Sequence, residues 1–222
     1  MQETYSTSQP QLGSLEISKV LRNTYALLAL TVLFSAFAAF VSMAIGMPYG
    51  ASMVCSIAAI ALIWFVLPRT ANSSAGIFVV FGFTGLLGAG LGPILNYYLA
   101  TSAGSAIVMQ ALGGTALIFF GLSGYTLVSR KDFSFLTGFI MTGLMVAFVA
   151  AIANIFLQIQ GLSLVISSVF LFLSSLAIMW QTSRIIHGGE TNYIMATASL
   201  YVSLYNIFVS LLNILSIMGG DD

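Results

Sequence analysis

Few ionisable side chains lie close enough in the sequence to do chemistry together, and one pair stands out. His187 and Glu190 are three residues apart in the stretch HGGETNY at 187–193. At this spacing the two side chains can share a metal ion, but they fall short of the three or four ligands of a zinc site. A nucleophilic reaction needs an activated hydroxyl, and nothing marks the neighbouring serine or threonine as one. The sequence therefore predicts no catalytic site, metal site or cofactor here.

The interpretation we favour for this stretch is a turn between two helices. The two glycines end one helix, and Glu190 and Thr191 begin the next, where a carboxylate suits the positive helix end. A docking loop for a partner is the remaining alternative.

A second set of polar side chains recurs along the last apolar stretch, Tyr193 to Met218. Its members are Ser199, Ser203, Asn206, Ser210 and Asn213, at spacings of four, three, four and three residues. On a helix this spacing forms one narrow stripe. Lipid offers these side chains no hydrogen bonds, so the stripe must face protein or water. Interhelical hydrogen bonding is the favoured interpretation, and a hydrated, uncharged path along the helix is the alternative.

The composition defines the class of protein. Of the 222 residues, 59% are hydrophobic and 5% are charged, and the mean hydropathy is +1.05. Soluble domains carry about a quarter charged residues, so this is an integral membrane protein. The formal net charge is zero, which leaves no basic face for nucleic acid. The single cysteine, Cys55, lies in an apolar stretch and excludes a disulfide framework.

Seven apolar stretches of membrane-spanning length are separated by short polar loops. They lie at 24–45, 51–67, 75–99, 106–128, 136–157, 162–185 and 193–218. The expected fold class is an all-α membrane protein, with a seven-helix transmembrane bundle at 24–218. A flexible N-terminal tail at 1–23 precedes the bundle, and a short tail at 219–222 follows it. Because of its polar stripe, we expect the last helix to be surrounded by the others.

The basic residues predict the orientation in the membrane. All six fall on one side of the predicted bundle: Lys19, Arg22, Arg69, Arg130, Lys131 and Arg184. The positive-inside rule makes that side cytoplasmic, so the N-terminus lies inside. With seven spans the C-terminus lies outside. If the last stretch is instead re-entrant, the C-terminus returns inside.

The third stretch contains a local helix breaker. Proline removes a backbone donor, so we expect the helix to end, kink or unwind at Gly92 and Pro93, shortly before Asn96. Gly88 and Gly92 are four residues apart, a spacing that lets helices approach closely. No ionisable residue lies in the middle of any stretch, which argues against a pump or an ion-coupled transporter.

Several segments together resemble the transmembrane Bax inhibitor motif family. These are FTG at 83–85, LGPILNYYL at 91–99, GETNY at 189–193 and SLYVSLYNIF at 199–208. Two further segments, KVLRNTY at 19–25 and GGTAL at 113–117, are similar to a bacterial branch of that family, which modulates the membrane protease FtsH. The resemblance implies a seven-helix bundle with the last helix at its centre.

The resemblance implies two rival functions. Channel-like members leak calcium, gated by two acids, one late in the sixth helix and one midway along the seventh. Those positions match Gln181 and Ser203 here, so both acids are missing. Neither replacement titrates, and calcium would lose its anionic oxygen ligands. A cation leak without this pH-sensing pair is therefore the alternative function.

The bacterial branch implies the function that we expect. Its member is a non-enzymatic inner-membrane protein that binds FtsH, an ATP-driven protease with a membrane regulatory complex, and slows degradation of other membrane proteins. The polar residues 1–18 correspond to a cytoplasmic tail through which the protease engages a poor substrate. The expected partners are thus FtsH and the lipid bilayer.

Overall fold

A computed structural model describes residues 13–219 of the chain, and every regular element in this range is a helix. The elements are α1 (Ser14–Ala44), α2 (Tyr49–Ala61), the π-helical η1 (Leu62–Val66), α3 (Leu67–Thr70), α4 (Ala75–Leu99), α5 (Gly104–Ser129), the 3-10 helix η2 (Ser134–Leu136), α6 (Thr137–Leu157), α7 (Gln160–Ile186) and α8 (Tyr193–Met218). Seven helical spans are long and apolar enough to cross a membrane, with α2, η1 and α3 forming one of them. The predicted fold class is confirmed.

The first helix starts earlier than the sequence suggested. Helix α1 begins at Ser14, so residues 14–23, expected in the tail, are helical. Glu16 lies in the first turn, where a carboxylate is favourable, and no proline or glycine interrupts the segment. Residues 1–12, the rest of the expected tail, lie outside the described residues.

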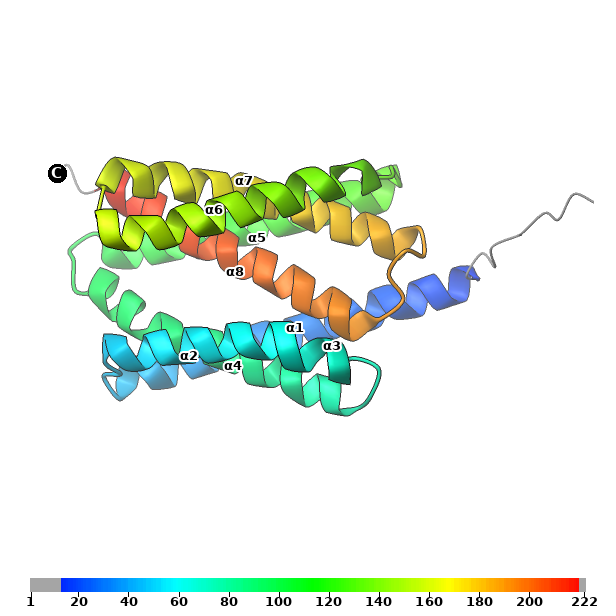
Figure 1. Cartoon of the computed structure of the whole chain (residues 1–222), viewed down its shortest axis with the longest axis horizontal. Coiled ribbons are helices and arrows are strands. Elements are labelled where there is room, and N and C mark those ends of the chain that lie inside the picture. The colour runs from blue at the N-terminus through cyan, green and yellow to red at the C-terminus, as the bar shows by residue number, and fades with distance from the viewer. Residues whose placement is uncertain (1–12, 220–222) are drawn as a thin grey trace, which may run out of the picture.

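The helices form two groups with α8 between them (Figure 1). Helices α1, α2 and α4 lie on one side, α5, α6 and α7 lie on the other, and α8 crosses obliquely from one end to the other. Helix α8 packs against α1, α4, α5 and α7. Its side chains Leu200, Ile207 and Leu212 are almost completely buried. The last helix therefore has the central position that we expected.

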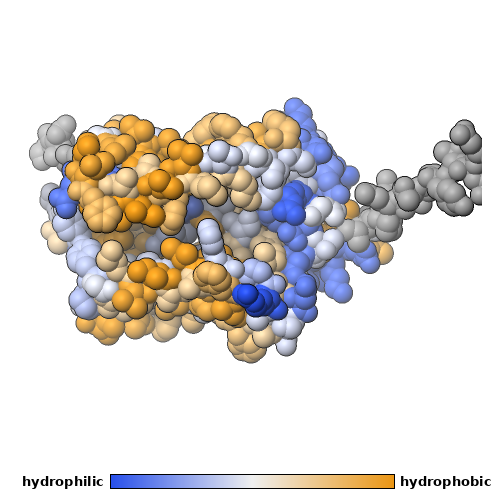
Figure 2. Space-filling view, viewed as in Figure 1, coloured by the Kyte–Doolittle hydropathy of each residue, from blue (hydrophilic) through white to orange (hydrophobic). Residues whose placement is uncertain are grey.

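Polar residues gather at one end of the bundle. Figure 2 shows the most hydrophilic side chains at the end where α1 begins, and apolar side chains along the flanks. The connections α3–α4, α5–α6 and α7–α8 lie at this same end (Figure 1). Arg130 and Lys131 lie in the α5–α6 connection, and Arg69 and Arg184 lie near the C-terminal ends of α3 and α7. Helix α8 starts here and finishes at the opposite end without interruption. Its 26 residues are long and apolar enough to cross a membrane.

A serine of α1 supports the backbone of α4 at its proline. Because Pro93 has no N–H, the carbonyl four residues earlier, that of Ala89, loses its usual partner within the helix. Ser42 Oγ donates a hydrogen bond of 2.7 Å to this oxygen. Helix α4 consequently runs unbroken from Ala75 to Leu99. The expectation that it ends or unwinds at Gly92 and Pro93 is wrong.

Helices α1 and α4 approach so closely that two positions on α4 require glycine. A Cβ atom on Gly88 would overlap the backbone carbonyl oxygen of Ser35. A Cβ atom on Gly92 would overlap the hydroxyl of Ser42. The small-residue pair of the sequence analysis thus lies at a helix interface, where a methyl group would force the two backbones apart.

Further side-chain bonds join α1, α2 and α4 into one unit. Asn96 Nδ2 donates to the carbonyl oxygen of Met43, in the last turn of α1, at 3.2 Å. Ser52 Oγ of α2 donates to the carbonyl oxygen of Gly90 at 2.6 Å. Asn96, expected near a helix break, instead serves as a donor to a neighbouring helix end, whose last carbonyls lack intrahelical partners.

The serine–proline arrangement makes a testable prediction. The Ser42→Ala substitution leaves the Ala89 carbonyl without a donor in a dry environment, so it should lower the free energy of unfolding by about 1–3 kcal/mol. Thermal unfolding in detergent measures the loss. Pro93→Ala restores the backbone donor, so the same serine substitution should cost less in that background. Ser168→Ala, which removes an exposed hydrogen bond within α7, is the control. Equal losses in both backgrounds would contradict the compensation.

Candidate functional site

Helices α7 and α8 share a polar interface. Asn213 Oδ1 of α8 accepts hydrogen bonds from Ser163 Oγ at 3.3 Å and from Ser167 Oγ at 3.1 Å, both on α7. Ser174 and Gln181 follow on α7 at spacings of seven residues from Ser167, so they lie on the same helix face. We call these four α7 residues, with the five-residue stripe of α8, the polar seam.

The stripe residues of α8 are placed inside the protein to different degrees. Ser203 and Ser210 are 5% and 4% exposed, whereas Ser199 and Asn206 are half-buried. Ser203 Oγ donates to the carbonyl oxygen of Ser199 at 3.0 Å, within its own helix. A serine that bonds to its own helix needs no water, so this part of the seam is compatible with a dry helix interface.

Gln181 and Ser203, the two positions that we expect to match the acids of the channel-like members, are buried and neutral. Gln181 is 2% exposed, and its Nε2 has no hydrogen-bond partner among the described residues. Ser174 Oγ, on the same face of α7, also lacks one within that range. Since Ser203 Oγ is engaged by its own helix, no hydrogen bond joins Gln181 to Ser203 in the described part of the chain. An unpaired buried amide costs stability, so Gln181 is the weakest point of the seam.

The turn before α8 is capped, but not by the residues that we expected. Asn192 is the N-cap, and its Oδ1 accepts from the backbone N–H groups of Ile194 (2.9 Å) and Met195 (3.1 Å). Glu190 lies outside the helix, and its Oε1 accepts from the backbone N–H of Asn192 at 3.0 Å. The expectation that Glu190 and Thr191 begin the helix is wrong, because asparagine is a better cap and accepts from the N–H groups of the second and third residues of α8.

Asn192 also joins two loops that are distant in the sequence. Its Nδ2 donates to the carbonyl oxygen of Ala71 at 3.0 Å and to Asn72 Oδ1 at 2.9 Å. One side chain thus fixes the start of α8 to the α3–α4 connection. An asparagine immediately before an apolar stretch is a helix-start signal, so the cap was detectable from sequence, whereas the contact with the distant loop was not.

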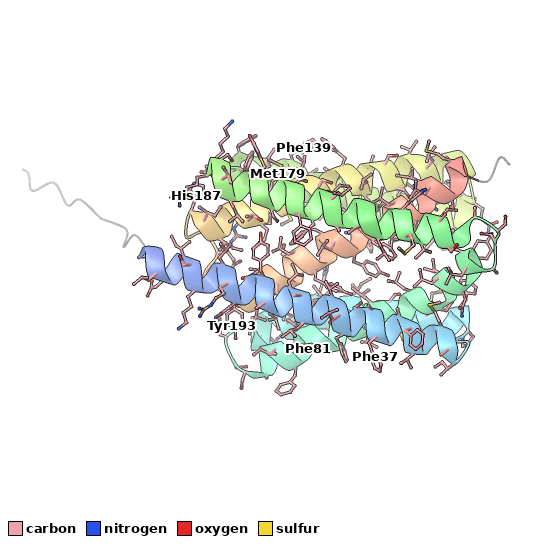
Figure 3. All side chains as sticks on the ribbon, turned by 180° about the vertical axis from the view of Figure 1, so that it is seen from behind. Phe37, Phe81, Phe139, Met179, His187 and Tyr193 are labelled. Atoms are coloured by element: carbon pink, nitrogen blue, oxygen red, sulfur yellow. The ribbon has the colours of Figure 1, made fainter. Side chains whose placement is uncertain are left out.

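The side chains of His187 and Glu190 have separate partners. His187 Nδ1 lies 2.9 Å from the carbonyl oxygen of Ser183, one turn earlier on α7. Glu190 pairs with Arg184 at 3.7 Å, and the Arg184 guanidinium lies over the Trp180 ring at 4.9 Å from its centroid. Figure 3 shows His187 at the hydrophilic end of the bundle. Within residues 13–219, no group of three His, Cys, Asp or Glu side chains is placed to hold a metal ion.

The α5–α6 connection is fixed to α7 in the same way. Ser183 Oγ accepts from the backbone N–H of Phe133 at 3.0 Å and donates to the carbonyl oxygen of Lys131 at 3.2 Å. Asp132 accepts from the hydroxyl and the backbone N–H of Ser134, and these hydrogen bonds lower the pKa of its exposed carboxyl group. The loops at this end of the bundle are therefore held in place by side-chain hydrogen bonds and form a preformed surface.

The geometry defines a multi-pass membrane protein whose central helix meets its neighbour in a neutral polar seam. Residues 17–220 match the family described as Bax1-I, inhibitor of apoptosis-promoting Bax1. The chain belongs to this family, as the sequence motifs indicated.

Similar proteins occur in several bacteria. The chain is 51% identical over 221 residues, covering all of both chains, to the Modulator of FtsH protease YccA of Escherichia coli K12. It is 49% identical over 221 residues to an uncharacterized protein, PA2604, of Pseudomonas aeruginosa, covering 100% of this chain and 99% of the relative. It is 48% identical over 209 residues to an uncharacterized membrane protein of Vibrio cholerae, covering 94% of each.

The two roles of Asn192 can be separated by substitution. Asn192→Ala removes the cap and the contact with the α3–α4 connection, and it should lower the free energy of unfolding by about 1–2 kcal/mol or more. Asn192→Ser keeps a capping oxygen but loses the loop contact, so its stability should be intermediate. Chemical or thermal unfolding in detergent gives the values, with the exposed Thr191→Ala as control. If the serine variant is as unstable as the alanine variant, the cap contributes little.

Proposed function

We propose that this chain is an inner-membrane protein that binds FtsH and slows the degradation of other membrane proteins. The observation that carries the proposal is the 51% identity, over the full length of both chains, with the E. coli protein named as modulator of FtsH protease. The chain is also 51% identical to a protein named Inner membrane protein YccA, which supports a location in the inner membrane. The N-terminus would then lie in the cytoplasm and the C-terminus outside.

The chemistry of the bundle supports a regulator rather than an enzyme. The buried polar groups of the seam are neutral hydroxyls and amides, whereas catalysis requires a nucleophile beside a base, or a metal ion. The basic residues lie at the hydrophilic end of the bundle, near the water interface. A protein of this kind acts through the surfaces that it offers to a partner.

The start of α1 supports an interaction with a cytoplasmic protease. Figure 1 shows the first turns of α1 extending past the ends of the other helices. Glu16, Lys19 and Arg22 in these turns are exposed. The described part of the chain thus begins at a point beyond the ends of the other helices. The preformed loops of the same end offer a second, rigid surface for binding.

The test is a reconstituted degradation assay. Proteoliposomes containing FtsH and a membrane substrate should degrade that substrate several-fold more slowly when this protein is present, and the two proteins should co-purify. Deleting residues 2–12 leaves α1 intact and should remove most of the slowing while co-purification persists. A variant with residues 2–12 in shuffled order, which keeps the length and composition of the segment, should retain the effect. Unchanged degradation without co-purification would overturn the proposal.

A cation leak along the polar seam is the second candidate function. The observation that favours it is the incomplete pairing of Gln181 Nε2 and Ser174 Oγ, since unpaired polar groups attract water. Against it stands the loss of both acids, because calcium prefers several anionic oxygen ligands. The polar seam thus supports a cation leak less strongly than the full-length similarity supports the modulation of FtsH.

Restoring the acids tests the second candidate. The leak predicts that Gln181→Asp combined with Ser203→Asp confers calcium flux into liposomes, and that this flux changes over the pH range in which the carboxyl groups titrate. Gln181→Asn combined with Ser203→Asn, similar in size but unable to titrate, is the matched control. Flux no greater than that of empty liposomes at every pH would exclude even a dormant path.

A further inference from the structure

A long groove lies between the two groups of helices. It has a volume of about 770 Å³, with walls formed by α1 and α5 and a floor formed by α8. Seen from behind in Figure 3, α1 and α5 lie apart, and α8 crosses between them. Helix α1 packs on α4 and α8, and α5 packs on α8 and α7, so the groove separates the two groups.

The groove opens sideways, where the bilayer would be, rather than toward water. Its edges include exposed apolar side chains of both walls: Leu33 (68%) and Phe40 (67%) of α1, and Leu112 (50%) and Phe120 (71%) of α5. Both walls are membrane-spanning helices. The groove is therefore continuous with the lipid-facing surface of the protein.

Most polar atoms along the groove are already paired within the protein. Tyr201 Oη lies 2.5 Å from Ser35 Oγ and donates to the carbonyl oxygen of Thr84 at 3.2 Å. Thr115 Oγ1 donates to the carbonyl oxygen of Ala111 at 2.7 Å. These groups offer little to water or ions, so the groove suits an apolar occupant.

The length of the groove suits hydrocarbon chains. The groove extends along α1 from Tyr25 to Met43, which at ~1.5 Å per residue is about 27 Å. This length is close to the ~30 Å thickness of the hydrocarbon core of a bilayer. A hydrocarbon chain is only about 4–5 Å wide, since carbons in contact are 3.5–4.0 Å apart. Acyl chains that run along the membrane normal therefore fit the groove along its length.

A basic side chain stands at the cytoplasmic end of the same wall. Arg22 precedes Ala29 by seven residues, and Ala29 precedes Ala36 by seven, so the three lie on one face of α1. Both alanines line the groove, and Arg22 is exposed. A guanidinium at the membrane–water interface is well suited to a lipid phosphate.

We propose that this groove binds the acyl chains of an anionic phospholipid, with Arg22 contacting the phosphate of the headgroup. The bound chains fill the space between α1 and α5 and complete the packing of the two helix groups around α8. This site is independent of FtsH and of the polar seam.

Photocrosslinking in proteoliposomes tests the proposal. The probe is a phosphatidylglycerol with a photoreactive diazirine in its acyl chain, and mass spectrometry locates the labelled residues. Labelling should be several-fold higher at Ala36, Leu112 and Ala116 than at Ala153, an exposed residue of α6. Equal labelling of the groove and of α6 would overturn the proposal, as would a groove that crosslinks to a protein helix instead of lipid.

Two variants sharpen the test. Ala36→Phe combined with Ala116→Phe fills the groove and should reduce its labelling several-fold, whereas Ala153→Phe on the outer surface should leave it unchanged. Arg22→Gln alters only an exposed side chain, so it remains informative if the filled variant does not fold. In native mass spectrometry it should lose the preference for phosphatidylglycerol over phosphatidylcholine. An unchanged preference for phosphatidylglycerol would show that Arg22 does not contact the headgroup.

Discussion

The bilayer interior provides no hydrogen bonds, and this constraint governs the whole structure. A backbone or side-chain polar group at membrane depth is stabilised only by a partner inside the protein, and groups without one among residues 13–219, such as Gln181 Nε2 and Ser174 Oγ, cost stability. The contact between Ser42 Oγ and the Ala89 carbonyl is the clearest case, because a proline creates the need and a neighbouring helix meets it. The serines of α7 that bond to Asn213 follow the same rule. Small polar side chains thus form the hydrogen bonds that water molecules would form in a soluble helix bundle.

Helix α8 satisfies this constraint for both groups of helices at once. Toward α1 and α4 it presents the Tyr201 hydroxyl, which bonds to Ser35 and to the Thr84 carbonyl. Toward α7 it presents Asn213, which accepts from Ser163 and Ser167. A helix with polar groups in two directions has to be enclosed, which explains why α8 lies at the centre. Helix α8 makes most of the connection between the two groups, and smaller direct contacts add to it, such as those of Tyr25 of α1 with Phe119 of α5 and with Thr182 of α7.

The sequence was sufficient for features that depend on composition and spacing, and insufficient for those that depend on distant partners. Apolar length located the seven spans, and the stripe spacing indicated the central helix. The expectation that the helix ends or unwinds at Pro93 was wrong because the donor, Ser42, belongs to another helix and has no local signature. The kink that was the third alternative stays a prediction. The tail boundary was misplaced because polarity alone does not show that 14–23 is helical. The groove could not be predicted from the sequence, because it depends on which side chains of α1 and α5 do not contact one another in the folded protein.

The attachment of α1 has a mechanical consequence. Along its length α1 is fastened by Thr197 Oγ1 to the Thr24 carbonyl, by Tyr201 to Ser35, and by Ser42 to α4. A force applied at the N-terminal end of α1, parallel to the helix axis, loads these contacts in shear and together, rather than breaking them one at a time. A hydrogen bond broken inside the bilayer also leaves its donor and acceptor unpaired, because no water is present to bond to them. A motor that pulls on this end therefore meets its greatest resistance at the first step.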